Sequence, residues 1–245
     1  MDNALYVGLS RQMTLRHELD IVANNIANAD TAGFKVESLI VETKPLASAR
    51  TLDGPKPVKF VLDVGVARDF TGGPLHSTGA PLDLGIEGPG FFKVAGPEGE
   101  AYTRDGRFRL DEAGKLTTQA GHAILDAGGG EIVIDPLKGG VKIATDGTIS
   151  QGSEQVGRVA VVTFDALSVL EKAGDNLLHN TSNQQPQPAT SSLVHQGMLE
   201  GSNVNSVAEI TRMIEVTRAY ESMAKMMDST AELSRRSIER MGRVQ

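Results

Sequence analysis

The chain has 245 residues, a formal net charge of −7 and an apolar share of 40%. This share supports a packed core and excludes a fully disordered protein. The chain contains no cysteine, which excludes a disulfide scaffold, a thiol nucleophile and thiolate metal sites. The acidic balance disfavours a nucleic-acid partner, because no basic excess is present to neutralise phosphates. No uninterrupted apolar run exceeds four residues, so we expect neither membrane insertion nor a cleavable signal peptide.

Glycine and proline are concentrated in the middle of the chain. Of the 27 glycines, 21 lie between Gly54 and Gly157, and all ten prolines lie between Pro45 and Pro188. Both residue types interrupt helices and mark turns. The sequence therefore predicts a helical arm at each end and a β-rich body between them.

Residues 3–28 are predicted to form the first helix. Apolar side chains recur at steps of three and four, with one change of phase. They are Leu5, Leu9 and Met13 before the change, and Leu15, Leu19, Val22 and Ile26 after it. Asn25 and Asn28 flank Ile26 beside this stripe, so we expect their amides to be buried against an adjacent helix. Gly33 is predicted to end the helix or form the following turn.

The central part of the sequence predicts short strands separated by turns. The expected strands cover residues 59–66, 82–86, 90–94, 107–110, 121–125, 131–134 and 158–164. Hairpin-type turns are expected at Asp105-Gly106, Asp146-Gly147 and Glu112-Ala113-Gly114. One short helix is expected within 165–172, and a polar linker or surface strap follows it. Short strands at this spacing indicate an antiparallel sandwich or barrel-like body.

The last helix is predicted within residues 202–241, which contain neither glycine nor proline. Ser206 and Glu209 have the spacing of a capping box, which predicts a helix start near Ser206. A regular three–four spacing follows and predicts a coiled-coil seam. The seam positions are Ile210, Met213, Thr217, Tyr220, Ala224, Met227, Ala231, Ser234, Ile238 and Met241. Ile214, next to Met213, is expected in the layer between helices, where a charge would be costly.

The sequence contains no recognisable catalytic, cofactor-binding or metal-binding constellation. The five histidines are scattered, and the glycine clusters at 88–90 and 128–130 lack a phosphate-binding pattern. Asp83 with Glu87, or Asp105 with Asp111, are the nearest approach to an acid–base pair. Surface carboxylates of an acidic β domain explain these residues better. We therefore expect a protein that is not an enzyme and that needs no cofactor or metal.

Four sequence blocks carry a family resemblance. They are the segments 24–35 (NNIANADTAGFK), 78–92 (TGAPLDLGIEGPGFF), 101–108 (AYTRDGRF) and 199–205 (LEGSNVN). The last block is followed by Glu209, Met213, Ile214, Arg218, Tyr220 and Glu221. Together the blocks resemble the bacterial flagellar rod and hook proteins. The opening residues 1–6 and the length most resemble the proximal-rod members, with the distal-rod and hook members as alternatives.

The resemblance implies a structural subunit of the basal-body rod, the torque-transmitting drive shaft required for motility. The implied fold is α+β, with N- and C-terminal helices forming a coiled-coil-like domain around an inserted, mainly antiparallel β body. The expected divisions are an N-terminal helix (1–35), an extended or β connector (36–75), a central β domain (76–179), a polar linker (180–200) and a C-terminal helix (201–245). The implied location is the periplasmic rod, after flagellum-specific export without a cleavable signal peptide.

The implied partners are other rod proteins of the same family and further copies of this chain in a helical tube. The contacts between subunits are expected on the terminal helices. The expected interface residues are Leu5, Leu9, Leu19, Val22, Asn25, Ile26, Asn28, Ile210, Met213, Ile214, Tyr220, Met227 and Ile238. Two hypotheses from other classes stay open at this point. One is a secreted enzyme whose acidic β domain holds Asp83 or Asp105 in a deep pocket, and the other is a free-standing coiled-coil adhesin or scaffold.

Overall fold

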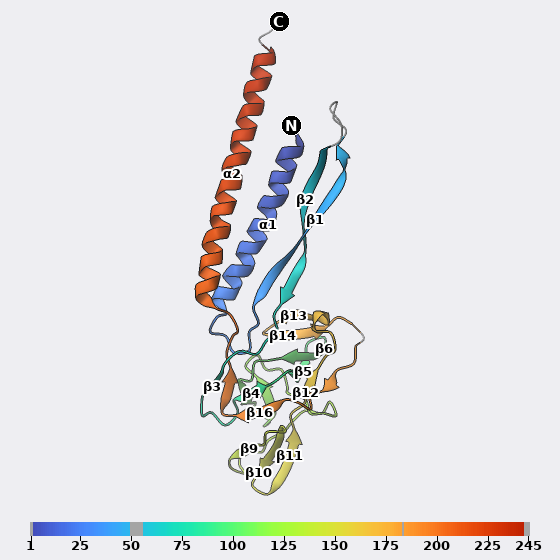
Figure 1. Ribbon diagram of the computed structural model, residues 1–245. Helices are drawn as coiled ribbons and strands as arrows, with labels where there is room; N and C mark the ends of the chain where they lie inside the picture. The colour runs from blue at the N-terminus through green and yellow to red at the C-terminus, as the bar shows by residue number, and fades with distance from the viewer. Residues whose placement is uncertain (1, 50–55, 183, 243–245) are drawn as a thin grey trace. The chain divides into compact units, whose positions relative to one another are not determined.

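The computed structural model describes residues 2–49, 56–182 and 184–242 and has one long helix near each end, with strands between them (Figure 1). The expected α+β class with a mainly antiparallel β body is thus confirmed. Contacts divide the described chain into two units. The helical unit comprises 2–27, the described part of 37–68, and 205–242. The β unit comprises 28–36 and the described part of 69–204. Neither helix of the described ranges is long and apolar enough to cross a membrane.

The helical unit contains two antiparallel helices and one long hairpin (Figure 1). Helix α1 covers Asp2–Ala27 and helix α2 covers Ser206–Gly242. Strands β1 (Glu37–Ala49) and β2 (Lys56–Arg68) pair antiparallel, and both contact α1. An ion pair of 2.8 Å between Arg68 Nε and Glu37 Oε1 joins the two strands at the open end of the hairpin. Most of the segment expected to be a connector, 36–75, is therefore a hairpin within the helical unit.

The start of α2 is close to its predicted position, but its cap is a different residue. The helix begins at Ser206, and the backbone N–H of Ala208 donates to Asn205 Oδ1 over 3.1 Å. Asn205 therefore acts as the N-cap, and the expected capping role of Ser206 is wrong. The Glu209 carboxylate, which a capping box would use locally, accepts a hydrogen bond from Asn25.

The β unit is built from several small antiparallel sheets. The largest has the order β13-β14-β6-β5-β12-β15, and a three-stranded sheet has the order β11-β10-β9. Three further pairs are β16-β4, β17-β3 and β7-β8. The bounds are β3 Leu75–Ser77, β4 Leu84–Glu87, β5 Phe91–Gly96, β6 Gly99–Thr103, β7 Phe108–Leu110, β8 Leu116–Thr118, β9 Val141–Ile143, β10 Thr148–Gln151, β11 Glu154–Arg158, β12 Val161–Thr163, β13 Leu170–Gly174, β14 Leu177–Asn180, β15 Gln187–Pro188, β16 Leu193–Gln196 and β17 Met198–Glu200.

Two apolar clusters hold these sheets together. The larger includes Leu84, Val94, Leu116, Ile124 and Ile134, none of which is measurably exposed. The smaller consists of Phe91, Tyr102, Val162, Phe164 and Leu170. The Tyr102 and Phe164 rings meet edge to face with centroids 4.9 Å apart, a favoured aromatic geometry. Burial of these side chains supplies the main driving force for folding of the β unit.

Several local predictions for the β unit are wrong. Residues 121–125 and 131–134 form isolated bridges instead of strands, and the expected helix at 165–172 is a single 3-10 turn, Leu167–Val169. The expected linker at 180–200 contains β15, β16 and β17. Partners distant in sequence give these segments their structure, so local composition does not reveal it.

Asp105-Gly106 is not a hairpin turn, because β6 pairs with β5 and β14 while β7 pairs with β8. Gly106 instead allows a close backbone approach: its carbonyl accepts from the Leu84 N–H at 3.0 Å, and a Cβ on Gly106 would lie 1.7 Å from the Leu84 carbonyl oxygen. The other two predicted turns do connect paired strands, β7 with β8 and β9 with β10.

Candidate assembly surface

The inner faces of α1 and α2 pack closely against each other. A Cβ on Gly8 would lie 3.0 Å from Met227 Cγ, so glycine allows the helices to approach at this point. Nearer the start of α2, Arg212 Nη2 lies 3.0 Å from Glu18 Oε1. Val216 is the one buried side chain of α2 within the described residues, with 6% of its surface exposed.

Asn25 connects three elements of the helical unit. Its side chain is 1% exposed, and its Nδ2 donates to the Glu37 carbonyl (2.8 Å) and to Glu209 Oε2 (3.0 Å). Its Oδ1 accepts from the Glu37 N–H at 3.0 Å. The amide therefore joins α1 to β1 and to α2. Asn25 is buried as expected, and these bonds are all made within its own chain.

Asn28 lies beyond the end of α1 and makes a turn. Its Oδ1 accepts from the Thr31 hydroxyl, and its carbonyl accepts from the Thr31 N–H, both at 3.1 Å. It is half-buried, and these bonds are local to the segment 28–31. The two asparagines thus act in different places, although the sequence pattern treats them alike.

The expected interface residues fall into three groups by exposure. Val22 and Asn25 are buried, while Leu19, Ile26, Asn28, Met213, Tyr220 and Met227 are half-buried. Leu9, Ile210 and Ile214 are exposed. Leu5 lies in α1 and Ile238 in α2, but their side chains are outside the described part of the structure.

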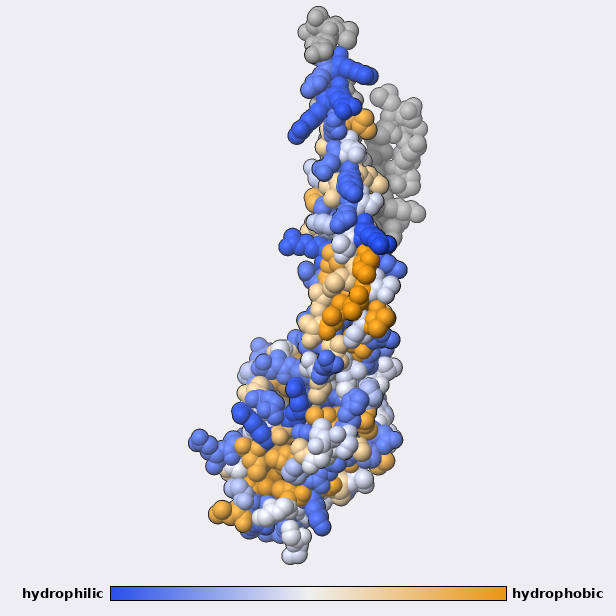
Figure 2. Space-filling view, turned by 90° about the vertical axis from the view of Figure 1, so that its left-hand side faces the viewer, coloured by the Kyte–Doolittle hydropathy of each residue, from blue (hydrophilic) through white to orange (hydrophobic). Residues whose placement is uncertain are grey.

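Both helices carry an outer apolar face that is uncovered within the described structure. On α1 it consists of Tyr6, Leu9 and Met13, which are 62%, 46% and 65% exposed. On α2 it consists of Val207, Ile210 and Ile214, which are 75%, 48% and 48% exposed. Each triplet has the spacing i, i+3, i+7, which places its side chains on one side of the helix. In Figure 2 apolar side chains gather over the N-terminal part of α2. These six residues are called the outer face below.

The predicted seam of α2 combines residues of its inner and outer faces, whereas the two predicted sets of α1 correspond to different faces. In α1 the change of phase after Met13 corresponds to a change of face, because Leu9 and Met13 are exposed while Leu15 and Val22 are 2% exposed. Thr14 and Ile21 are also buried and were missed. In α2 the inner face includes Val216, whereas the predicted seam residue Thr217 is exposed. When a helix has two apolar faces, its apolar residues fit more than one regular spacing, so the sequence alone does not identify the inner face.

A second group of residues, missed by the sequence analysis, lies buried in the β unit. Glu200 is 1% exposed, and its carboxylate meets Lys35 Nζ at 2.5 Å and Arg104 Nη1 at 2.8 Å. The Gly73 N–H also donates to Glu200 Oε1 at 2.9 Å. Lys35, Arg104 and Glu200 are called the Glu200 cluster below. They come from three of the four sequence blocks that carry the resemblance. The presence of a charged residue in each of these blocks was the one sequence feature that pointed to the cluster.

The Glu200 cluster holds two cations and one anion away from water. Lys35 Nζ donates further to the Thr71 carbonyl at 2.7 Å, and Arg104 Nη2 donates to the Gly88 carbonyl at 2.7 Å. The Arg104 guanidinium also lies 5.4 Å from the centre of the Phe91 ring. Burial lowers the pKa of Lys35, and the hydrogen bond to Glu200 opposes this shift. Each buried charge thus depends on its partners for compensation.

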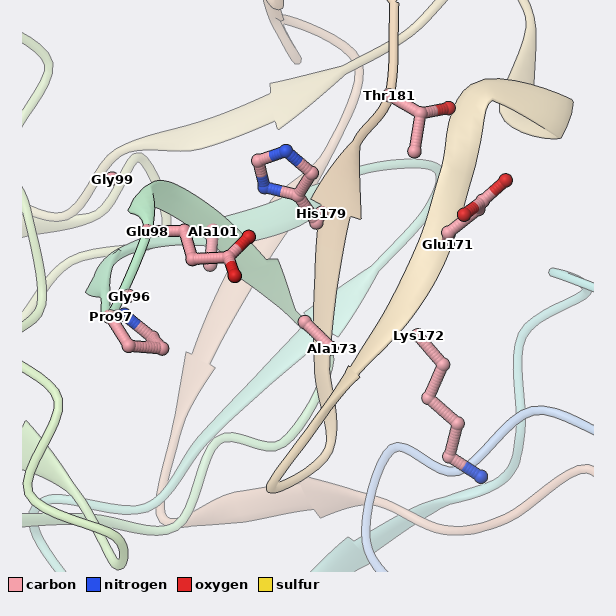
Figure 3. A pocket seen from close by; sticks show the side chains of 10 residues that line it. All are labelled: Gly96, Pro97, Glu98, Gly99, Ala101, Glu171, Lys172, Ala173, His179 and Thr181. Carbon is pink, nitrogen blue, oxygen red and sulfur yellow. The ribbon is translucent and has the colours of Figure 1, made fainter.

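Four hollows are described in the β unit. One of them, with a volume of about 290 Å³, lies between the turn at 96–99 and strands β13 and β14. Figure 3 shows that His179 and Glu98 line this hollow and that the Lys172 side chain points away from both. The Lys172 ammonium lies 5.2 Å from the centre of the Phe34 ring. Among the described residues, no group of three acidic, histidine or cysteine side chains is placed to hold a metal ion.

The two carboxylates that the enzyme hypothesis places in a pocket, Asp83 and Asp105, have local structural partners. Asp83 accepts from the Thr78 hydroxyl at 2.6 Å, and Asp105 pairs with Arg107 at 2.7 Å. Asp105 lines a hollow of about 220 Å³, whereas Asp83 lines none of the four described hollows. None of the four described hollows is lined by both carboxylates.

Three regions of the chain match models of known protein families. Residues 5–35 match the family model "Flagella basal body rod protein", and residues 85–151 match "Flagellar hook protein FlgE/F/G D1 domain". Residues 195–240 match "Flagellar basal body rod FlgEFG protein C-terminal". These regions include the outer face, Arg104 and Glu200.

Similarity to curated proteins extends over the full length. The flagellar basal-body rod protein FlgF of Caulobacter vibrioides is 62% identical, with 100% of both chains covered. FlgF of Mesorhizobium japonicum is 37% identical, with 99% of both chains covered. The flagellar basal-body rod protein FlgG of Bacillus subtilis is 32% identical, covering 95% of this chain and 97% of its own. The chain therefore belongs to the flagellar basal-body rod protein family and, within it, to the FlgF group.

Proposed function

We propose that the protein is a structural subunit of the proximal part of the flagellar rod and that its outer face contacts neighbouring subunits. The observation that carries this proposal is the pair of exposed apolar triplets on α1 and α2. Six large apolar side chains in two regular rows are costly to leave in water, and such patches mark interaction surfaces. Membership of a rod-protein family supports neighbouring rod subunits as the partners.

The inner and outer faces have different tasks in this proposal. Asn25, the Glu18–Arg212 pair and the Gly8–Met227 contact hold α1 and α2 together within one subunit. The outer face then packs against helices of other rod proteins and other copies of the chain, in a coiled-coil-like layer. Contacts between unlike surfaces can add subunit after subunit without closing a ring, and such a helical assembly forms a tube.

The mechanism is mechanical. A tube of packed helices with β units attached to it transmits torque from the motor toward the hook, and no bond is made or broken. No cofactor is needed, and we propose no enzymatic activity. The location in this proposal is the periplasmic part of the basal body, reached by flagellum-specific export without a cleaved signal peptide.

The experiment is complementation of a strain that lacks this gene, followed by imaging of purified basal bodies and a swimming assay. The wild-type chain should restore a complete rod and swimming. Ile214→Asp places a charge on the outer face, so we expect export without a complete rod and without swimming. The matched control, Glu215→Gln, changes an exposed polar neighbour and should restore both. A complete rod in the uncomplemented strain would refute the assignment to the rod.

A further inference from the structure

Residues 198–203 connect segments of the β unit that are far apart in the sequence. Strand β17 pairs with β3, from Met198 opposite Ser77 to Glu200 opposite Leu75. The Gly33 N–H donates to the Glu200 carbonyl, and the Gly201 N–H donates to the Pro74 carbonyl, both at 2.8 Å. This segment therefore binds both the stretch after α1 and the stretch after the hairpin.

Asn203 adds a second connection between the same stretches. Its Oδ1 accepts from the Val36 N–H at 2.8 Å, and its Nδ2 donates to the Asp69 carbonyl at 2.9 Å. The Asp69 N–H in turn donates to the Val36 carbonyl at 3.1 Å. The chain thus leaves the β unit after 36 and re-enters it at 69, and Asn203 bonds to the backbone at both of these points.

Glu200 supplies the negative charge at the centre of this arrangement. Lys35 and Arg104 are 165 and 96 residues away in the sequence, and their side chains are 5% and 4% exposed. Without Glu200 the two cations would be buried near each other with no carboxylate between them. Removing one partner from a buried ionic group is far more destabilising than replacing the whole group by apolar residues. Such a loss is a large share of the stability of a domain of this size.

We propose that residues 198–203 are a closing segment, and that the β unit does not fold until this segment is in place. The six-stranded sheet and the Glu200 cluster then form in one cooperative step. We expect this step to be slow, because its contacts close loops of more than a hundred residues.

This proposal concerns folding, and the purified chain alone can test it. Its consequence for the organism rests on the function proposed above. A subunit exported as an unfolded chain, N-terminus first, would have its β unit kept unfolded until almost the whole sequence is available. The β unit would then form only after the closing segment had been exported.

The test is refolding of the full-length chain from urea with pulsed hydrogen exchange. The closing contacts are reported by the amides of Gly33 and Gly201, and the core by the amides of Leu116 and Ile124. The Leu116 and Ile124 N–H groups donate to the carbonyls of Ile132 and Leu116 at 2.9 and 2.8 Å. We expect all four amides to become protected with the same rate constant. Protection of Leu116 and Ile124 in an earlier phase than Gly33 and Gly201 would overturn the proposal.

A variant tests the role of the charge. Glu200→Gln has nearly the same shape and should gain core protection at Leu116 and Ile124 more slowly during refolding, even though both lie outside the Glu200 cluster. Glu87→Gln is the matched control, because Glu87 is an exposed carboxylate that bonds His195 at 2.6 Å. Glu87→Gln should refold like the wild type. Core protection in Glu200→Gln equal to that of the control would contradict the proposal, whatever the effect of either variant on motility.

Discussion

Arg104 and Glu200 form an ion pair of 2.8 Å with side chains that are 4% and 1% exposed. Lys35 completes the group from the other side of the same carboxylate. The three residues join the segment after the first helix, the centre of the β unit and the segment before the last helix. The ends of the β unit are thereby fixed at one buried point.

The three members of the Glu200 cluster should differ in cost when replaced. Glu200→Gln leaves two buried cations, and we expect a loss of about 3–5 kcal/mol in the free energy of unfolding of the β unit. Lys35→Met and Arg104→Met each leave one ion pair and should cost less. Urea unfolding of the three purified variants checks this order. A larger loss in Lys35→Met than in Glu200→Gln would contradict the central place given to Glu200.

Asn25→Ala should destabilise the helical unit. The change leaves the Glu37 N–H without its acceptor and Glu209 without its donor, at a cost of about 1–3 kcal/mol. We expect a lower urea midpoint for loss of the helical circular dichroism signal, and reduced swimming. Asp20→Ala, at an exposed position of the same helix, is the control and should behave like the wild type. Equal midpoints for the two variants would mean that the Asn25 bonds add nothing to stability.

Gly8 should tolerate little enlargement. A Cβ would lie 3.0 Å from Met227 Cγ, and Met227 is a flexible side chain that can yield to one methyl group. Gly8→Ala should therefore have a small effect, and Gly8→Val should separate α1 from α2 and reduce swimming. Shortening the opposing residue, in Gly8→Val with Met227→Ala, should restore part of the swimming. Absence of any restoration would argue against direct contact at this point.

Gly106 and Gly72 form a matched pair of glycine positions in the β unit. A Cβ on Gly106 would lie 1.7 Å from the Leu84 carbonyl oxygen, whereas a Cβ on Gly72 meets nothing within 4 Å. Gly106→Ala must displace the backbone and should lower the melting temperature clearly. Gly72→Ala should leave it unchanged. Thermal unfolding of both variants decides the matter, and equal melting temperatures would refute the close approach at Leu84.

The β unit should lose stability in alkaline solution. Burial, followed by the charge of Glu100, raises the pKa of Tyr102 to about 12. In the unfolded chain tyrosine ionises near pH 10, so above about pH 10 the unfolded state releases a proton that the folded state retains. The contribution of Tyr102 to stability is therefore complete below about pH 10 and lost as the pH rises toward 12. Urea unfolding at several alkaline pH values should show this slope, and Tyr102→Phe should reduce it.

The sequence predicted the elements whose signals are local. Periodicity placed both helices, and Asn25 was expected to be buried because it lies beside the apolar stripe. Glu200, Lys35 and Arg104 have no such signal, since each is an ordinary charged residue until the fold brings them together. Val216 was missed because α2 has an inner and an outer apolar face, and the most regular spacing ran across both. Strand β17 was missed because its partner is β3, more than a hundred residues away.

The central claim is that the outer face is exposed in the free subunit and covered in the rod. The chain contains no cysteine, so Ile214→Cys introduces a single thiol on that face. Its reaction with a maleimide should be rapid in the purified subunit and strongly slowed in isolated basal bodies. Glu98→Cys, at an exposed turn of the β unit, is the control for access of the reagent and should react in both. Equal reaction of Ile214→Cys in free subunits and in basal bodies would contradict the claim.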